Sequence, residues 1–318
     1  MKKPTRKMYE PQLQQFYYPM RLFARFARRK WAVKLLNSME KRAKGKDVDG
    51  LDCVQRYIPS KNGGPDIRVR VYRPINNNET LPCMVHFHGG GYMMSSPEAF
   101  SGFIKNIIDT RTCVVITPDY RLSVDNPFPD GFNDCYDTVL WAKENANELK
   151  IDASKFILAG HSAGGGLTAA VTLKARDTKD FNIAFQMPIY PMIDHRQQTE
   201  SAKTMTTAPV WDTKTNKFAW ELYLRNIKGE VPSYASPSLN TDFKNMPPTI
   251  SFVGDLEPFK DETLNYVEAL KKERIPVNFK LFKGAFHGFE VLHKYANVSD
   301  EANRFQIQAF AEYYDAYF

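Results

Sequence analysis

Cysteine is scarce in this 318-residue chain, which contains only Cys53, Cys83, Cys113 and Cys135. These residues lie far apart and form no Cys-x-x-Cys pair, so their spacing indicates neither a disulfide framework nor a thiolate metal site. Three of them fall in or beside apolar segments, where cysteine behaves as a small hydrophobic residue. We therefore expect reduced thiols and no bound metal.

Long hydrophobic runs are also missing. No stretch approaches the roughly 18 consecutive apolar residues typical of a membrane-spanning helix. The basic start, Met-Lys-Lys-Pro-Thr-Arg-Lys, is not followed by the apolar core of a signal peptide. Together with the reduced thiols, these absences predict a cytoplasmic protein.

Acidic residues are depleted in one segment only. Residues 1–46 contain 14 lysines and arginines but only two acidic residues, Glu10 and Glu40, which gives a local net charge of +12. The rest of the chain has 29 basic and 34 acidic residues, a net charge of −5. A protein that binds nucleic acid across a broad face would carry its positive charge over the whole domain, whereas here the charge is confined to one segment. We therefore expect no nucleic-acid partner.

Within the basic segment, residues 13–44 show a helical pattern. Apolar residues recur in steps of three and four at Leu13, Phe16, Met20, Phe23, Ala27, Trp31 and Leu35. Pro19 predicts a break into two helices. We interpret the segment as a cap that docks this apolar stripe over a pocket and leaves its basic residues in water. Contact with an anionic membrane surface is the alternative.

From about residue 53 onward, β-rich runs alternate with helical patterns. A turn at 61–64 joins the first two runs as a hairpin, and strand–helix pairs then continue to the end of the chain. This alternation predicts an α/β fold with a mostly parallel central sheet and helices on both faces. We divide the chain into N-terminal cap helices (1–50), a core (51–193), a cap insertion (194–247) and a second core segment (248–318).

The most informative motif is Gly160-His161-Ser162-Ala163-Gly164, which lies between an apolar run and a small-residue helical stretch. It predicts a strand, a tight turn and a helix, with the serine at the apex of the turn. The glycines allow the sharp turn, and a helix N-terminus favours developing negative charge. Ser162 is therefore the candidate nucleophile.

Three consecutive glycines, Gly89, Gly90 and Gly91, follow another apolar run. Glycine destabilises ordered structure unless the backbone needs its freedom, so we expect this triplet to have a function. Backbone N–H groups that no side chain obstructs can approach a substrate carbonyl closely. We predict an oxyanion hole formed by the N–H groups of Gly90, Gly91 and Ala163, with Gly89 shaping the loop.

A histidine and a carboxylate complete the candidate site. His287 lies in a short loop after a late strand, from which it can reach the serine and act as a general base. The preceding strand leads into a loop that contains Asp255 and Glu257, and either carboxylate could orient the histidine. Asp261 and Glu262 instead fit the first turn of the following helix, where acids interact favourably with the helix dipole.

Four segments occur together: His-Gly-Gly-Gly at 88–91, Asp-Tyr-Arg-Leu at 119–122, Gly-His-Ser-Ala-Gly-Gly at 160–165 and Gly-Ala-Phe-His-Gly-Phe at 284–289. In this order they resemble the motifs of the hormone-sensitive-lipase-like esterases of the α/β-hydrolase fold, in which the serine, the acid and the histidine follow one another along the chain. The resemblance spans about residues 70–290. It implies an α/β-hydrolase fold with an N-terminal helical cap.

The chain departs from the family pattern at the acid. The family's Asp-Pro-Leu-x-Asp-Glu corresponds here to Glu-Pro-Phe-Lys-Asp-Glu at 257–262. Carried over residue by residue, the resemblance places Glu257 in the acid position, with Asp255 as the alternative. Glutamate can serve if its loop lies slightly further back, because its side chain is one methylene longer. His161 also stands where the family often has aspartate.

Together, these features predict a serine carboxylesterase that hydrolyses short-chain acyl esters of a small-molecule substrate through an acyl-enzyme, without metal or cofactor. A deacetylase, a lactonase or an amidase could use the same residues. A catalytically silent ligand-binding homologue is a further alternative, since fold does not imply function. The final helix and strand could also pair two subunits into a homodimer.

Overall fold

The computed structural model describes residues 3–318, which form one eight-stranded sheet in the spatial order β1-β2-β4-β3-β5-β6-β7-β8. β1 and β2 pair antiparallel, which confirms the predicted hairpin, and β2 also pairs antiparallel with β4. All other neighbouring strands are parallel. The strands are β1 (Leu51–Ile58), β2 (Ile67–Pro74), β3 (Leu81–Phe87), β4 (Val114–Pro118), β5 (Ile151–His161), β6 (Ile183–Ile189), β7 (Thr249–Gly254) and β8 (Val277–Phe282).

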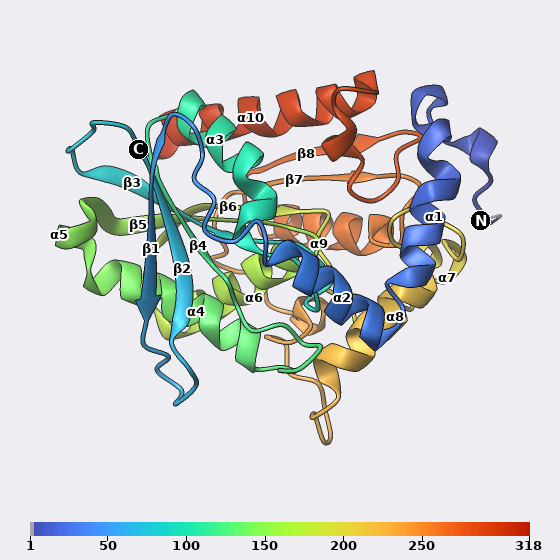
Figure 1. Cartoon of the computed structure of the whole chain (residues 1–318), viewed down its shortest axis with the longest axis horizontal. Helices are drawn as coiled ribbons and strands as arrows, with labels where there is room; N and C mark the ends of the chain where they lie inside the picture. Colours follow the sequence, from blue (N-terminus) through green and yellow to red (C-terminus); the bar gives the residue numbers. More distant parts are fainter. Residues whose placement is uncertain (1–2) are drawn as a thin grey trace.

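Helices cover both faces of the sheet, as the sequence predicted (Figure 1). α4, α6 and α9 lie on one face, and α3 and α10 lie on the other. The α-helices are α1 (Tyr17–Phe26), α2 (Lys30–Glu40), α3 (Ser101–Thr110), α4 (Asp130–Glu144), α5 (Ala146–Leu149), α6 (Ala163–Thr178), α7 (Glu200–Thr204), α8 (Thr213–Leu224), α9 (Lys260–Lys272) and α10 (Asn297–Tyr317). The 3-10 helices are η1 (Arg6–Met8), η2 (Pro11–Phe16), η3 (Pro97–Phe100), η4 (Pro237–Leu239) and η5 (Phe289–Leu292).

The central strands are buried almost throughout. Every residue of β4 and β7 is buried, and so are most residues of β3 and β6. Strands covered on both faces need apolar side chains on both, which is why they appear in the sequence as unbroken apolar runs. Among residues 3–318, no helix is both long enough and apolar enough to cross a membrane.

The N-terminal helices break at a different place from the one predicted. Pro19 lies in the first turn of α1, where the N–H that proline lacks would have no helical partner. The break falls instead at residues 27–29, and α2 then begins with a new rotational phase. Val33 is buried in α2, whereas Trp31 and Leu35 are exposed. The prediction of one docked stripe that includes these last two residues was therefore wrong.

The N-terminal helices lie beside a segment far away in the sequence. In Figure 1, α1, α2 and α8 gather on one side of the molecule, away from β1. Arg28 forms an ion pair with Asp212, whose side chain also caps the N-terminus of α8. The N–H of Val210 donates to the carbonyl oxygen of Met20 at 3.2 Å. These contacts join the N-terminal helices to the segment around α8, the two parts of the chain that are predicted to form a cap.

The turn after β5 brings α6 into backbone contact with β3. A Cβ on Gly160 would lie 2.3 Å from the carbonyl oxygen of Gly164, and a Cβ on Gly164 would lie 2.0 Å from that of Phe87. Real Cβ atoms essentially never approach other atoms within 3.0 Å, so only glycine fits at these two positions. The contacts therefore set the distance between the end of β3 and the start of α6.

We predict that Gly164→Ala lowers the free energy of unfolding by about 3 kcal/mol or more, because the added methyl group meets backbone atoms that cannot turn away. Gly102→Ala in α3 is the matched control, since nothing lies within 4 Å of its Cβ. Alanine should stabilise that helix by roughly 0.5–1 kcal/mol. Urea unfolding followed by circular dichroism measures both changes, and a Gly164→Ala variant as stable as wild type would contradict the close contact.

Candidate active site

Ser162 occupies the turn between β5 and α6 with φ 59° and ψ −119°. A positive φ is strained for a residue with a Cβ, and such strain clusters at functional sites. Two hydrogen bonds hold the conformation: the Ser162 N–H donates to the carbonyl oxygen of Ile189 at 3.0 Å, and the Met192 N–H donates to that of Ser162 at 3.0 Å. The serine therefore stands at the N-terminus of α6, where the first backbone N–H groups have no helical partners.

His287, in the loop after β8, connects this serine to an acid. Its Nε2 lies 2.8 Å from Ser162 Oγ, and its Nδ1 lies 2.5 Å from Glu257 Oε2. A carboxylate only accepts hydrogen bonds, so Nδ1–H donates to Glu257 and Nε2 accepts from the Ser162 hydroxyl. In this tautomer the histidine can remove the proton of the serine. The structure thus brings three of the predicted site residues into one hydrogen-bond chain.

The two candidate acids make different contacts. Glu257 is fully buried, and its second carboxylate oxygen accepts from the Gly254 N–H at 3.0 Å. Asp255 accepts from the Gly284 N–H at 2.7 Å and so ties the loop after β7 to the loop that carries His287. Burial raises the pKa of Asp255 above its ordinary value. Of the two acids, Glu257 is the one that contacts the histidine.

The other two acids of this region lie in the first turn of α9, where the sequence placed them. The Ser201 N–H donates to Asp261 Oδ2 at 2.7 Å, and the Ile193 N–H donates to Glu262 Oε1 at 2.8 Å. Burial raises the pKa of Glu262 well above its ordinary value. Both side chains therefore anchor the chain segments that follow β6 and do not contact the histidine.

The glycine loop lies directly against the serine. A Cβ on Gly89 would lie 3.6 Å from Ser162 Cβ. Gly90 and Gly91 have φ values of 113° and 62°, a region that favours glycine. In the part of the chain that the structure describes, the N–H groups of these two glycines donate to no protein acceptor. Ala163 is the first residue of α6. The serine therefore lies between the N–H groups of the glycine loop on one side and a helix N-terminus on the other.

Trp211 covers the site. A Cβ on Gly91 would lie 2.2 Å from the tip of the indole ring, and the indole centroid lies 6.3 Å from that of His287. The indole N–H donates to Asn216 Oδ1 at 3.2 Å, which fixes the orientation of the ring. Beneath it, Ser162 is 7% exposed and His287 is 4% exposed. Charges that develop among side chains so little exposed to solvent interact more strongly than in water.

Two residues beside the histidine were missed in the sequence. Tyr190 has a φ of 32°, and its ring centroid lies 4.8 Å from that of His287 in an edge-to-face arrangement. The tyrosine hydroxyl donates to Glu290 Oε1, and burial raises the pKa of Glu290 to about 6. Tyr190 could have been found in the sequence, because it directly follows a predicted strand. No sequence feature indicated Glu290, because a single acid three residues after a histidine is common.

His161, the unusual residue of the serine turn, faces away from the serine. Its Nε2 lies 3.2 Å from Gln306 Oε1, and its Nδ1 lies 3.4 Å from His86 Nε2. Burial lowers the pKa of His161 to about 4, so the ring is neutral near pH 7. It therefore belongs to the packing beneath the turn.

The four cysteines are free thiols, three of them buried. Burial raises the pKa of Cys113 to about 12, so this thiol stays protonated at neutral pH. Within residues 3–318, no three or more histidine, cysteine, aspartate or glutamate side chains are grouped to hold a metal ion. The hydrogen-bond chain of Ser162, His287 and Glu257 includes none of these thiols.

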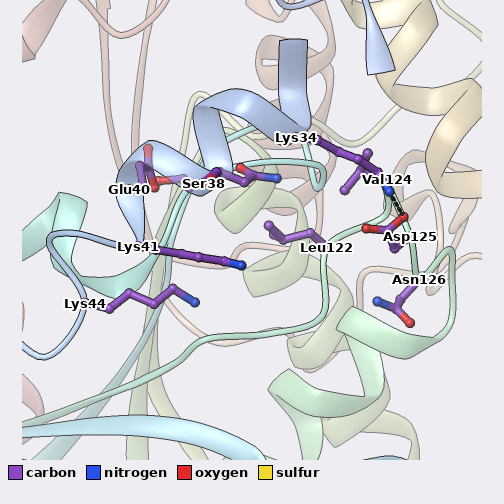
Figure 2. A pocket seen from close by; sticks show the side chains of 11 residues that line it. Lys34, Ser38, Glu40, Lys41, Lys44, Leu122, Val124, Asp125 and Asn126 are labelled. Carbon is purple, nitrogen blue, oxygen red and sulfur yellow. Dashed lines mark ion pairs between the residues drawn. The ribbon is translucent and has the colours of Figure 1, made fainter. Parts of the chain in front are cut away.

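A hollow of about 350 Å³ lies between α2 and the loop after β4 (Figure 2). The dashed line in Figure 2 marks the ion pair between Lys34 and Asp125. Its Nζ–Oδ1 distance is 2.8 Å, and Asn37, from the same lining, donates to the Met93 carbonyl oxygen at 3.0 Å. These contacts fasten α2 to the segments that surround the glycine loop. The hollow is thus part of the attachment of the N-terminal helices.

Comparison with models of protein families gives a match. The model of a family with the description "alpha/beta hydrolase fold" matches residues 84–291, a range that includes Ser162, Glu257 and His287. The chain belongs to this α/β-hydrolase family. The predicted fold is confirmed, and so is the resemblance to hormone-sensitive-lipase-like esterases.

Several relatives of this α/β-hydrolase have names that state an activity. An arylesterase of Saccharolobus solfataricus is 29% identical over 225 residues, which cover 70% of this chain and 73% of the relative. Carboxylesterase NlhH of Mycobacterium tuberculosis (strain ATCC 25618 / H37Rv) is 29% identical over 232 residues, 72% of each chain. The solved structure of a bacterial heroin esterase has a TM-score of 0.85 at 29% identity and covers 98% of this chain and 99% of its own.

The buried carboxyl of Glu290 predicts a pH effect on stability. Its folded-state pKa of about 6 lies above the ordinary value of 4.5, so the folded protein holds this proton more tightly than the unfolded chain does. The associated stabilisation is complete at low pH and is lost as the pH rises through about 6. It amounts to about 2 kcal/mol, since one pKa unit corresponds to about 1.4 kcal/mol.

Glu290→Gln keeps an acceptor for the Tyr190 hydroxyl but does not titrate. Between about pH 4 and about pH 7.5, the free energy of unfolding of this variant should therefore rise by about 2 kcal/mol relative to that of wild type. Urea unfolding at the two pH values measures the difference. A difference that does not change with pH would contradict the raised pKa.

Proposed function

We propose that this protein is a serine carboxylesterase that hydrolyses short-chain acyl esters. The observation that carries the proposal is the hydrogen-bond chain from Ser162 through His287 to Glu257, next to the free N–H groups of the glycine loop. The names of the relatives support it, because an arylesterase, a carboxylesterase and a heroin esterase are all named for ester hydrolysis.

In the acylation step, His287 Nε2 takes the hydroxyl proton of Ser162 while Oγ attacks the ester carbonyl carbon. Glu257 stabilises the imidazolium by accepting its Nδ1–H. The carbonyl oxygen becomes an oxyanion, which the N–H groups of the glycine loop and of Ala163 stabilise. The bond to the alcohol then breaks, the histidine protonates the leaving oxygen, and the acyl group stays esterified to Ser162.

In the deacylation step, water takes the place of the alcohol. His287 removes one of its protons as the water oxygen attacks the acyl carbonyl, and the same N–H groups stabilise the second oxyanion. Collapse of this intermediate breaks the bond to Ser162, and the histidine returns a proton to Oγ. The products are the free acid and the original hydrogen-bond chain.

Bulky side chains around the site support a short acyl group. Trp211 packs against Gly91, and the rings of Tyr190 and Phe259 lie 4.8 Å and 4.9 Å from that of His287. Rings packed this closely around the histidine favour a short acyl group over a long aliphatic chain. We propose that Trp211 sets the limit on acyl length, because its ring is the one that lies on the glycine loop.

Substitutions of the serine and of the two candidate acids, Glu257 and Asp255, test the proposed triad. Ser162→Ala and Glu257→Gln should each lower kcat on p-nitrophenyl butyrate by about 10⁴-fold or more. Asp255→Asn is the matched control: it should lower kcat by less than about tenfold, because its amide oxygen still accepts from the Gly284 N–H.

Loss of activity in Asp255→Asn but not in Glu257→Gln would contradict the assignment of the acid. No turnover of any p-nitrophenyl ester by wild type, with turnover of an anilide, a lactone or an acetylated sugar, would favour an amidase, a lactonase or a deacetylase. No turnover of any of these would favour a ligand-binding homologue.

A series of p-nitrophenyl esters from acetate to palmitate tests the acyl limit. For wild type, kcat/KM should peak between acetate and butyrate. Trp211→Ala should raise the ratio of octanoate to butyrate kcat/KM by about tenfold or more, because each methylene that fits an apolar pocket contributes roughly 1 kcal/mol. Trp141→Ala in α4 is the control and should leave the ratio unchanged. An unchanged ratio in Trp211→Ala would contradict the assignment.

A further inference from the structure

An exposed apolar stripe runs along the outer face of the two N-terminal helices. Its members recur at every fourth residue and are Tyr18, Leu22 and Phe26 in α1 and Trp31, Leu35 and Met39 in α2. Apart from the half-buried Phe26, these side chains are between 48% and 69% exposed. The Phe26 and Trp31 rings meet edge to face with centroids 5.3 Å apart, which joins the two rows. The stripe is therefore continuous across the break between the helices.

Within residues 3–318, the apolar contacts that anchor these helices to the core come from their other side chains. The inner face of α1 packs through Ala24, and that of α2 packs through Ala32 and Val33, all fully buried. The break at residues 27–29 is what turns the large side chains of α2 outward. Large apolar side chains gathered on a surface usually mark an interaction site.

Unpaired cations surround the stripe. Arg25, Arg29, Lys30, Lys41 and Arg42 are exposed, and among the residues that the structure describes none of them forms an ion pair. They belong to the segment with a net charge of +12, whereas the rest of the chain has a net charge of −5. The surface therefore combines apolar side chains with a local excess of positive charge.

We propose that this outer face, the apolar stripe with its flanking cations, binds the surface of an anionic lipid bilayer. Leu22, Leu35 and Met39 would enter the boundary between headgroups and acyl chains, and the cations would attract anionic headgroups. Tyr18 and Trp31 have the amphipathic rings that are enriched at this depth. Apolar insertion and electrostatic attraction together give a binding strength that neither supplies alone. The proposal does not depend on the proposed esterase activity.

The charge of the surface argues for a lipid occupant. A second copy of the chain bound through the same face by two-fold symmetry would bring identical unpaired cations together. A nucleic acid would bind the cations through its phosphates but would make no use of exposed leucine and methionine side chains. An anionic bilayer matches both features.

Vesicle sedimentation tests the proposal on the full chain. Wild type should pellet with vesicles of phosphatidylcholine and phosphatidylglycerol but not with phosphatidylcholine alone. Binding should fall as salt rises from 0.1 M to 1 M, because the screening length shortens from about 10 Å to about 3 Å. The variant L22S/W31S/L35S should bind at least about tenfold more weakly, since three apolar side chains no longer enter the lipid.

The variant V54S/Y57S/I75S is the matched control, since it removes three exposed apolar side chains of the β1–β2 region. It should bind like wild type. A charge variant, R25E/R29E/K30E, should lose binding even if the apolar variant folds poorly. Circular dichroism checks the folding of each variant.

Fluorescence locates the contact. Trp31 is exposed, Trp141 is half-buried, and Trp211 and Trp220 are buried, so lipid contact at the stripe should shift the emission of Trp31 to shorter wavelength. Trp31→Phe keeps an apolar ring and should still pellet, but without the shift.

Three results would overturn the proposal. Folded wild type that fails to pellet with phosphatidylglycerol vesicles excludes the lipid surface. Equal pelleting of wild type and L22S/W31S/L35S would mean that the cations bind polyanions in general. A concentration-dependent dimer, seen by light scattering and lost in that variant, would assign the face to a second copy of the chain.

Discussion

Backbone contact between β3 and α6 is the constraint on which the site depends. Gly164 lies so close to the carbonyl oxygen of Phe87 that no side chain fits between them. The contact holds the glycine loop, which follows β3, beside Ser162, which follows β5. A shift of about 1 Å between catalytic groups can lower a rate by about 10²-fold. In the proposed mechanism, this packing therefore decides whether the glycine-loop N–H groups and Ser162 act on the same carbonyl group.

The acid and the histidine come from the loops after β7 and β8, the last two strands of the sheet. β7 and β8 pair in parallel up to Gly254 and Phe282, so the loops that follow them meet at one edge of the sheet. Asp255 links these loops, and the longer Glu257 side chain reaches the histidine. The N-terminal helices and the segment around α8 then enclose this edge. One face of α1 and α2 thus completes the interior, while their outer face carries a separate apolar stripe.

Features encoded by local pattern could be predicted from the sequence. Buried parallel strands appear as unbroken apolar runs, and glycine clusters mark the turns where the chain approaches itself. The error at Trp31 and Leu35 arose because helical periodicity holds only within one helix, and neither glycine nor proline marks the break at residues 27–29. Glu290 was missed because its contact with Tyr190 depends on how η5 packs against the end of β6, which no local pattern encodes.

Covalent labelling with a p-nitrophenyl phosphonate tests the central claim most directly, because an activated serine displaces p-nitrophenolate and keeps the phosphonyl group on Oγ. Peptide mass spectrometry then identifies the labelled residue. We expect one adduct per chain, on Ser162, formed in parallel with the loss of ester hydrolysis and much more slowly in His287→Ala. An adduct on another residue would contradict the account. So would protein that is labelled at Ser162 but keeps its full ester-hydrolysis activity.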